Sequence, residues 1–394
     1  MAPGSPDLSL EALLLGGGSA DEVYAALLAL PEEARAPALR ALSPVARRHL
    51  PGRRAAAHPD DQRDALLGLM FDSTPDEEAE TLARLVWARF HLRVGPDRDP
   101  SDGKGRRWEA RGLRRLWRVL AALPPADIED NERLRRLARF DVDAGAQASG
   151  NYGARVAAIG YDPATLEQAE QSFAQGPPSR QLDPLYGVNA FDETVRHEVG
   201  HAVDVRLGIM DRHGAEPAFG GWRAYGKDVR AVARDMAEAA AGPIHGWAEA
   251  AERERLIDWL ARRLEQGDAA RLDEALGELE FLDEERRARL RADAALRAAA
   301  CCKADDEPWM RGDLDGGVAL GGRIFQESYA GYWYSYDHAA RARKVSLYQF
   351  RAPAEWFAEA YAAYWEPPQE PGGERGARLK ERDPALWDWF RRNL

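Results

Sequence analysis

Two histidines four residues apart are the feature of this sequence with the clearest chemistry. His197 and His201 are the ends of the pentapeptide HEVGH, and Glu198 directly follows the first of them. Residues four apart project from one face of an α-helix, so both imidazoles can bind one zinc ion. Glu198 can reach a water molecule on that ion but is poorly angled to replace a histidine, which suits a general base. The alternative is a helix with two incidental histidines.

A catalytic zinc site needs a third protein ligand and an open fourth position. Glu355 is the candidate, because it lies near the start of a helix expected after Pro353, and Glu359 follows one turn later on the same face. Glu355 is expected to bind the metal, and Glu359 to accept the free ring N–H of His197. Aromatic flanks indicate that this helix is largely buried, where an unpaired acid would be costly.

The histidine pair requires a helix to present it. A four-residue apolar spacing predicts that helix from about Asn189 to a stop at Gly208. The first strand-like segment is 152–161, bounded by glycines and Pro163, and an edge strand is expected there that an extended substrate could join. A small sheet beside many helices gives a mainly α (α+β) fold class.

The remaining segments are predominantly helical. Residues 1–100 are predicted to form an all-helical module for docking, delivery or regulation, and Ser19 with Glu22 forms a capping box. The polar stretch 95–107 is the expected linker to a second domain at 101–394. Residues 227–303 are expected to form a helical insert that restricts access to the site.

Composition excludes several classes of function. The 394 residues are 45% hydrophobic and carry a net charge of -12, which indicates a folded protein that repels nucleic acid. The sequence contains no run of about 18 apolar residues, so it predicts no membrane span. The leucine run near its start is not preceded by the basic segment that is typical of a signal peptide. We expect a soluble protein that is cytoplasmic in the producing cell and has no classical signal peptide. Export by a specialised route is compatible with this expectation. The adjacent Cys301 and Cys302 rule out a disulfide framework and are interpreted as structural.

Three linked signatures resemble one known family. The segments HEVGHAVD at 197–204 and EWFAEAY at 355–361, with Tyr348 seven positions before Glu355, are similar to the metallopeptidase domain of anthrax lethal factor and its relatives. The resemblance covers about 150–210 and 340–394. It implies a zincin-like fold in which the zinc-binding helix lies beneath a short sheet.

The resemblance also implies residue roles. His197, His201 and Glu355 would be the zinc ligands, Glu198 the catalytic base, and Tyr348 the phenol that donates to the developing oxyanion. The chain departs from the family pattern because 153 residues lie between His201 and Glu355, far more than a compact loop. That departure affects the shape expected for the substrate cleft, but not the metal chemistry.

Two further residues are weaker candidates. His338 lies in an aromatic stretch, where it would either supplement Tyr348 or be a hydrogen-bonded core histidine. Asp204 lies further along the His197 face and would support the ligands or cap the helix end.

The leading hypothesis is a zinc-dependent endopeptidase of the gluzincin type, with one Zn²⁺ per chain and a protein or peptide substrate. A toxin-like effector is compatible with it. The alternative is a non-catalytic docking protein that retains a zincin scaffold.

Overall fold

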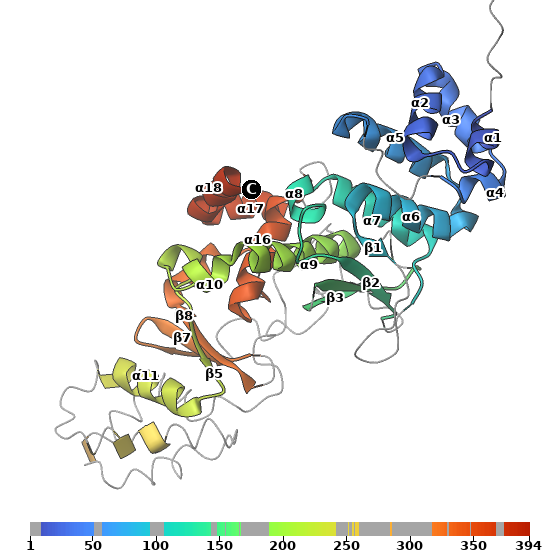
Figure 1. The fold of residues 1–394 in the computed structure, drawn as a ribbon. Coiled ribbons are helices and arrows are strands. Elements are labelled where there is room, and N and C mark those ends of the chain that lie inside the picture. The colour runs from blue at the N-terminus through green and yellow to red at the C-terminus, as the bar shows by residue number, and fades with distance from the viewer. Residues whose placement is uncertain are drawn as a thin grey trace, which may run out of the picture. The chain divides into compact units, whose positions relative to one another are not determined.

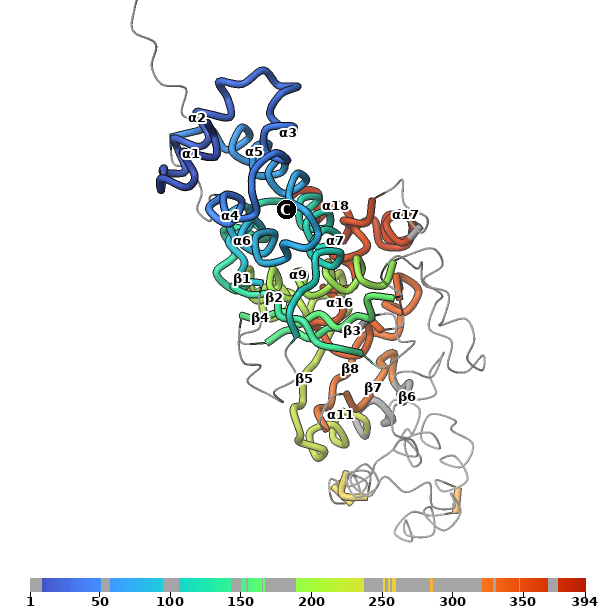
Figure 2. Tube along the Cα trace, turned by 90° about the vertical axis from the view of Figure 1, so that its right-hand side faces the viewer, coloured from blue at the N-terminus to red at the C-terminus, as the bar shows by residue number. Residues whose placement is uncertain are grey.

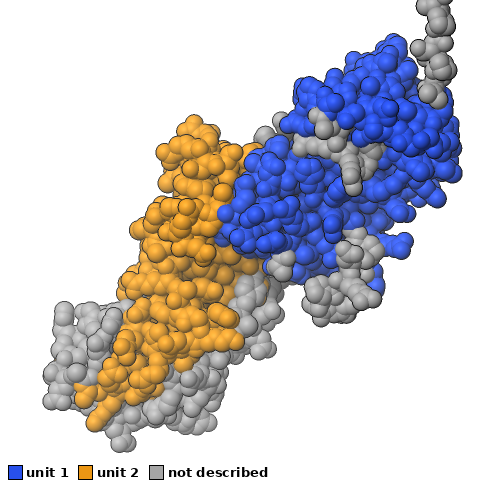
Figure 3. Space-filling model, in the orientation of Figure 1, with its two compact units in different colours: residues 1–169, 189–206 blue, residues 170–188, 207–394 orange. Residues whose placement is uncertain are grey.

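The computed structural model describes most of the chain. Its described residues are 9–50, 57–94, 106–142, 148–153, 155–164, 166, 189–241, 251, 254–255, 257–259, 284–285, 317–328, 331–346, 348–367 and 374–394. The chain divides into two compact units, shown in different colours in Figure 3. Unit 1 comprises residues 1–169 and 189–206, and unit 2 comprises 170–188 and 207–394.

Unit 1 begins with short helices. The predicted capping box is confirmed, because the Ser19 hydroxyl accepts from the Glu22 N–H and the Glu22 carboxylate accepts from the Ser19 N–H at 2.7 Å. The described α-helices of this unit before the HEVGH segment are α1 (Leu10–Leu15), α2 (Ala20–Ala29), α3 (Glu32–Ala41), α4 (Pro44–Arg47), α5 (Asp60–Ser73), α6 (Ala79–Phe90), α7 (Ala110–Ala121) and α8 (Pro125–Ile128). The expected linker lies mostly outside the described residues, and a domain boundary near residue 100 stays a prediction.

A four-stranded sheet completes unit 1. Its strands are β1 (Arg93–Val94), β2 (Arg136–Phe140), β3 (Ala148–Gly153) and β4 (Val156–Tyr161), in the order β1-β2-β4-β3. β1, β2 and β4 run parallel, and β3 is antiparallel to β4. In both Figure 1 and Figure 2, α6 and α7 lie on the same side of this sheet.

The strand predicted at 152–161 is confirmed over 156–161, but its predicted position at the edge of the sheet is wrong. That segment contains the end of β3, a tight turn and β4, and β4 lies between β2 and β3. Ala157, Ile159 and Tyr161 are fully buried, as expected of an internal strand. The true edge on this side is β3, whose sequence ASGNYG has no apolar alternation and therefore gave no strand signal.

Unit 2 contains a second four-stranded sheet, which the sequence did not predict. The strands β5 (Arg223–Gly226), β6 (Gly317–Leu320), β7 (Arg323–Glu327) and β8 (Trp333–Asp337) pair antiparallel in the order β5-β8-β7-β6. The other elements of the unit include α10 (Ile209–His213), α11 (Val229–Ala241), η7 (His338–Arg343), η8 (Tyr348–Phe350), α16 (Pro353–Tyr364), α17 (Glu374–Arg382) and α18 (Pro384–Asn393). Figure 1 shows α11 beside this sheet.

The predicted class is confirmed at its coarse level, since the chain is mainly helical with small sheets. Most of the helical insert expected at 227–303 lies outside the described residues, as do Cys301 and Cys302. Within the described part of the chain, every helix is too short or too polar to span a bilayer.

Candidate metal centre

The histidine pair lies on α9 (Ala190–Leu207), and the predicted limits of this helix are confirmed. At its start the Asn189 side-chain oxygen accepts a hydrogen bond from the Asp192 N–H at 3.2 Å. At its end Gly208 adopts a left-handed conformation with φ of 57°, which glycine tolerates without steric cost. The apolar stripe of Val195, Val199 and Val203 is fully buried. This stripe fixes which face of α9 turns inward.

Two ion pairs hold α9 at its two ends within unit 1. Arg115 of α7 forms a bidentate pair with Asp192 in the first turn, at 2.6 and 2.8 Å. Arg206 in the last turn donates to Asp127 of α8 at 2.8 Å. The carboxylates of both pairs are buried. Buried ion pairs fix the relative position of the elements they join, but their net contribution to the free energy of folding is small. They therefore set the position and the rotation of the histidine helix.

The imidazoles of His197 and His201 are close enough to share one metal ion. Their ring centroids are 4.7 Å apart with the planes at 86°, and a nitrogen of one ring lies within 4.8 Å of a nitrogen of the other. His197 is buried and His201 is partly buried. Zinc binds histidine nitrogens at about 2.0–2.1 Å, so two ligands in this arrangement fit a single ion.

Tyr152 of β3 is a neighbour of the site that the sequence did not reveal. Its ring stacks on His201, with centroids 6.2 Å apart and an interplanar angle of 19°. Its phenol donates a hydrogen bond to the carbonyl of Arg133 at 2.6 Å. Burial raises the pKa of Tyr152 above the ordinary value of 10.0, against the opposing effect of two nearby arginines. The phenol therefore stays protonated at neutral pH. The stacking of the two rings restricts the orientation of the His201 imidazole.

The Glu198 carboxylate lies directly against strand β3. Glu198 is buried, and a Cβ built on Gly150 of β3 would be only 2.3 Å from its Oε1 and 2.7 Å from Thr194. Glycine at position 150 thus allows the strand to approach the helix at the residue expected to act as base. Unit 1 alone therefore brings together the two histidines, the glutamate that follows the first of them and the edge strand.

We expect Gly150→Ala to lower by at least 10-fold the rate of any reaction in which Glu198 acts as the base, without loss of metal binding by the histidines. The added methyl group has no room beside Glu198 Oε1, so the carboxylate must move, and misplaced catalytic groups lose large factors in rate. Gly153→Ala on the same strand is the matched control, because a Cβ there meets nothing within 4 Å. Rates and zinc content of both variants test this, and equal turnover by Gly150→Ala would contradict the expected position of the base.

Two more acids accompany the histidines on α9. A carboxylate oxygen of Glu193, one turn before His197, lies within 4.8 Å of a His197 ring nitrogen. That places it where it can orient the imidazole, and the sequence reading missed it although the spacing of four residues was available. Asp204 is buried further along the helix. Its predicted supporting role stays a prediction.

The other acids predicted for the site lie on α16 in unit 2. Glu355 in its first turn and Glu359 one turn later are both buried. The guanidinium of Arg375 on α17 donates to Glu359 at 2.7 Å, and both members of this ion pair are almost fully buried. Arg375, which the sequence did not single out, therefore pairs with Glu359 and fixes its rotamer. Glu355 is not part of this pair.

Tyr348 lies directly before α16, in η8 of the same unit. Its side chain is partly buried, and the guanidinium of Arg351 lies 5.7 Å from its ring centroid. The adjacent Gln349 side chain accepts hydrogen bonds from the N–H groups of Val345 at 2.6 Å and Ser346 at 3.1 Å. These bonds hold the short turn that carries the tyrosine.

The predicted site residues fall into two sets. His197, Glu198, His201 and Asp204 belong to unit 1, whereas Tyr348, Glu355 and Glu359 belong to unit 2. His338 is also in unit 2, and its side chain is exposed at the start of η7, so it is not a core histidine. Comparison of the chain with protein-family models, curated proteins and solved structures found no match. Function is therefore inferred from these residues alone.

Proposed function

We propose that this protein is a zinc-dependent endopeptidase whose metal ligands are His197, His201 and Glu355. The observation that carries the proposal is the local geometry of α9. Two imidazoles one turn apart share a face, and the carboxylate beside them contacts an edge strand. Binding of a metal ion alone would not require Glu198 or the close approach of Gly150.

The donor set fits zinc. His197, His201 and Glu355 each offer one ligand atom of a type that zinc accepts, and two imidazoles with one carboxylate leave a fourth position for water or substrate. Glu193 and Glu359 are the carboxylates proposed to orient His197.

Zinc bound by these residues would supply a water of lowered pKa and would polarise the substrate carbonyl. The Glu198 carboxylate would accept a proton from the attacking water and later deliver it to the leaving amine. Tyr348 donates its phenolic hydrogen to the oxygen that becomes negatively charged as the carbonyl is attacked. Tyr152 keeps the His201 ring in place throughout.

Strand β3 is the proposed docking edge for the substrate backbone. Among the described strands it pairs only with β4, so its other edge offers hydrogen-bonding groups to an extended peptide. Gly150, at the point of contact with Glu198, lies in the middle of this strand. A substrate paired with β3 would therefore pass beside the catalytic base. Binding of an extended chain in this way favours an endopeptidase over an enzyme that removes terminal residues.

The proposal is tested by measuring metal content and proteolysis of the full-length protein together. Elemental analysis is expected to give about one zinc per chain. A proteome-wide analysis of new amino termini is expected to show cleavage that stops when zinc is chelated and resumes when zinc is restored. Bound zinc without any cleavage of denatured or native proteomes would favour the docking protein instead.

Tyr348→Phe is expected to lower the rate of cleavage about 10- to 1000-fold, the range for loss of one oxyanion donor. Zinc content should not change, because the phenol is not a ligand. The control is Tyr332→Phe, which removes the hydroxyl of an exposed tyrosine in the same unit. Loss of zinc from Tyr348→Phe would instead make the tyrosine a structural support of the site.

A further inference from the structure

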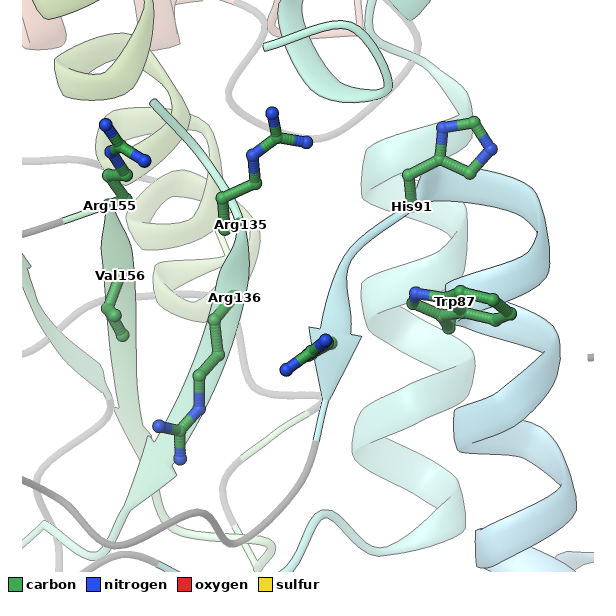
Figure 4. Close-up of a pocket in the computed structure, with 7 residues that line it drawn as sticks. Trp87, His91, Arg135, Arg136, Arg155 and Val156 are labelled. Carbon is green, nitrogen blue, oxygen red and sulfur yellow. The ribbon is translucent and has the colours of Figure 1, made fainter. Parts of the chain in front are cut away.

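A hollow in unit 1 is rich in arginine, and its lining residues do not include the proposed metal ligands. It has a volume of about 650 Å³, within the usual range of small-molecule sites. It lies between the end of α6 and the adjoining ends of β1, β2 and β4 (Figure 4). Its lining residues are Trp87, His91, Arg93, Arg135, Arg136, Arg155 and Val156.

The strand pairing brings these arginines together. Arg93 of β1 is in register with Arg136 of β2, and Arg136 is in register with Val156 of β4. The Arg135 N–H bonds to the Arg155 carbonyl at 2.9 Å. Like charges on neighbouring strands disfavour the fold unless something compensates them.

The charge of the hollow has no acidic counterpart in its wall. None of its lining residues is an aspartate or glutamate. Among the described residues, no ion pair joins Arg93, Arg135 or Arg155 to an acidic side chain, although the protein as a whole carries a net charge of -12. The cationic groups are therefore concentrated at one place on an otherwise acidic chain.

Two residues that line the hollow have a left-handed backbone conformation. In the part of the chain that the structure describes, the non-glycine residues with positive φ are His91, at 56°, and Arg155, at 71°. Both line the hollow. Arg155 directly precedes β4, and its left-handed conformation is one that favours glycine or asparagine. An arginine kept there at a cost in stability indicates a role for its side chain.

We propose that this hollow binds a small organic molecule carrying two or more phosphate groups. Guanidinium groups bind phosphate oxygens in bidentate pairs, and several arginines around one cavity match several phosphates. Trp87 supplies an apolar wall for the carbon part of the ligand, and Figure 4 shows it on α6 across from Arg135 and Arg136. The limited volume of the hollow and the acidic remainder of the chain favour a small ligand over a nucleic acid.

Calorimetric titration of the full-length protein tests the proposal directly. The probes are inositol hexakisphosphate, ATP, pyrophosphate and orthophosphate, each at 0.05 and 0.15 M salt. We expect binding by at least one polyphosphate at least 10-fold tighter than by orthophosphate, and weaker binding at the higher salt concentration. Tight binding of inositol hexakisphosphate but not ATP would indicate a polyphosphate ligand that carries no nucleobase. Binding of none of the four probes, or of single-stranded DNA in preference to them, would overturn the proposal.

Variants separate the hollow from general charge attraction. Arg93→Ala and Arg136→Ala should each weaken binding of the tightest probe about 10-fold or more. Arg118→Ala, which removes an exposed arginine of α7 outside the hollow, should leave binding unchanged. An equal loss of affinity for the probe in all three variants would show that binding is non-specific charge attraction, and would contradict the proposed site.

Arg155→Gly gives a readout that a purely structural arginine would not. Relief of the strained backbone should raise the melting temperature by about a few degrees. Binding of the tightest probe should become weaker by about 10-fold. A higher melting temperature with unchanged binding would show that Arg155 does not contact the ligand, and would remove the strain argument.

Discussion

Glu198→Gln is expected to yield a folded, zinc-containing protein that has lost at least about 100-fold, and up to about 10,000-fold, of its peptide hydrolysis. The amide keeps the size of the carboxylate, so it fits the close approach of Gly150, but it cannot accept a proton from water. The effect should fall on kcat rather than on substrate binding, because the base acts only as the reaction proceeds.

The matched control for this variant is Glu216→Gln, which removes one negative charge from an exposed residue paired with His213. It should leave turnover and zinc content unchanged. Zinc content and melting temperature measured in parallel separate loss of the base from loss of the site. Turnover by Glu198→Gln equal to that of the unmodified protein would exclude Glu198 as the base and would require another proton acceptor.

His197→Ala and His201→Ala are each expected to weaken zinc binding by more than about 100-fold. Changes to residues that merely orient a metal ligand typically cost 10- to 100-fold, and removal of a ligand itself costs more. Added zinc should raise the melting temperature of the unmodified protein and should not raise that of either variant, since binding to the folded state stabilises it.

The control histidine is His213, whose Nδ1 bonds to Glu216 at 2.8 Å near the protein surface. His213→Ala should bind zinc like the unmodified protein. Zinc retained at full affinity by both motif variants would contradict a metal site on α9. Zinc lost from those two variants but retained by Glu355→Gln would keep the histidine pair and assign the third ligand to another residue.

Some features of this protein follow from its sequence alone. The limits of α9 and the start of α16 are determined by local signals, namely Asn189 and Gly208 for the first helix and Pro353 for the second. The shared face of His197 and His201 follows from helical geometry, which does not depend on distant residues. The capping box of Ser19 with Glu22 is equally local.

Other features depend on residues that are far apart in the sequence and were decided only by the tertiary structure. Strand β3 has no apolar alternation and exists because β4 pairs with it, so the contact of Gly150 with Glu198 could not be predicted. The partner of Glu359 is Arg375, 16 positions away on another helix. The arginine hollow likewise arises because strand pairing brings Arg93 and Arg136 into register. Helices are specified by neighbours within one turn, whereas strand partners and buried ion pairs are specified by the packing of the whole unit.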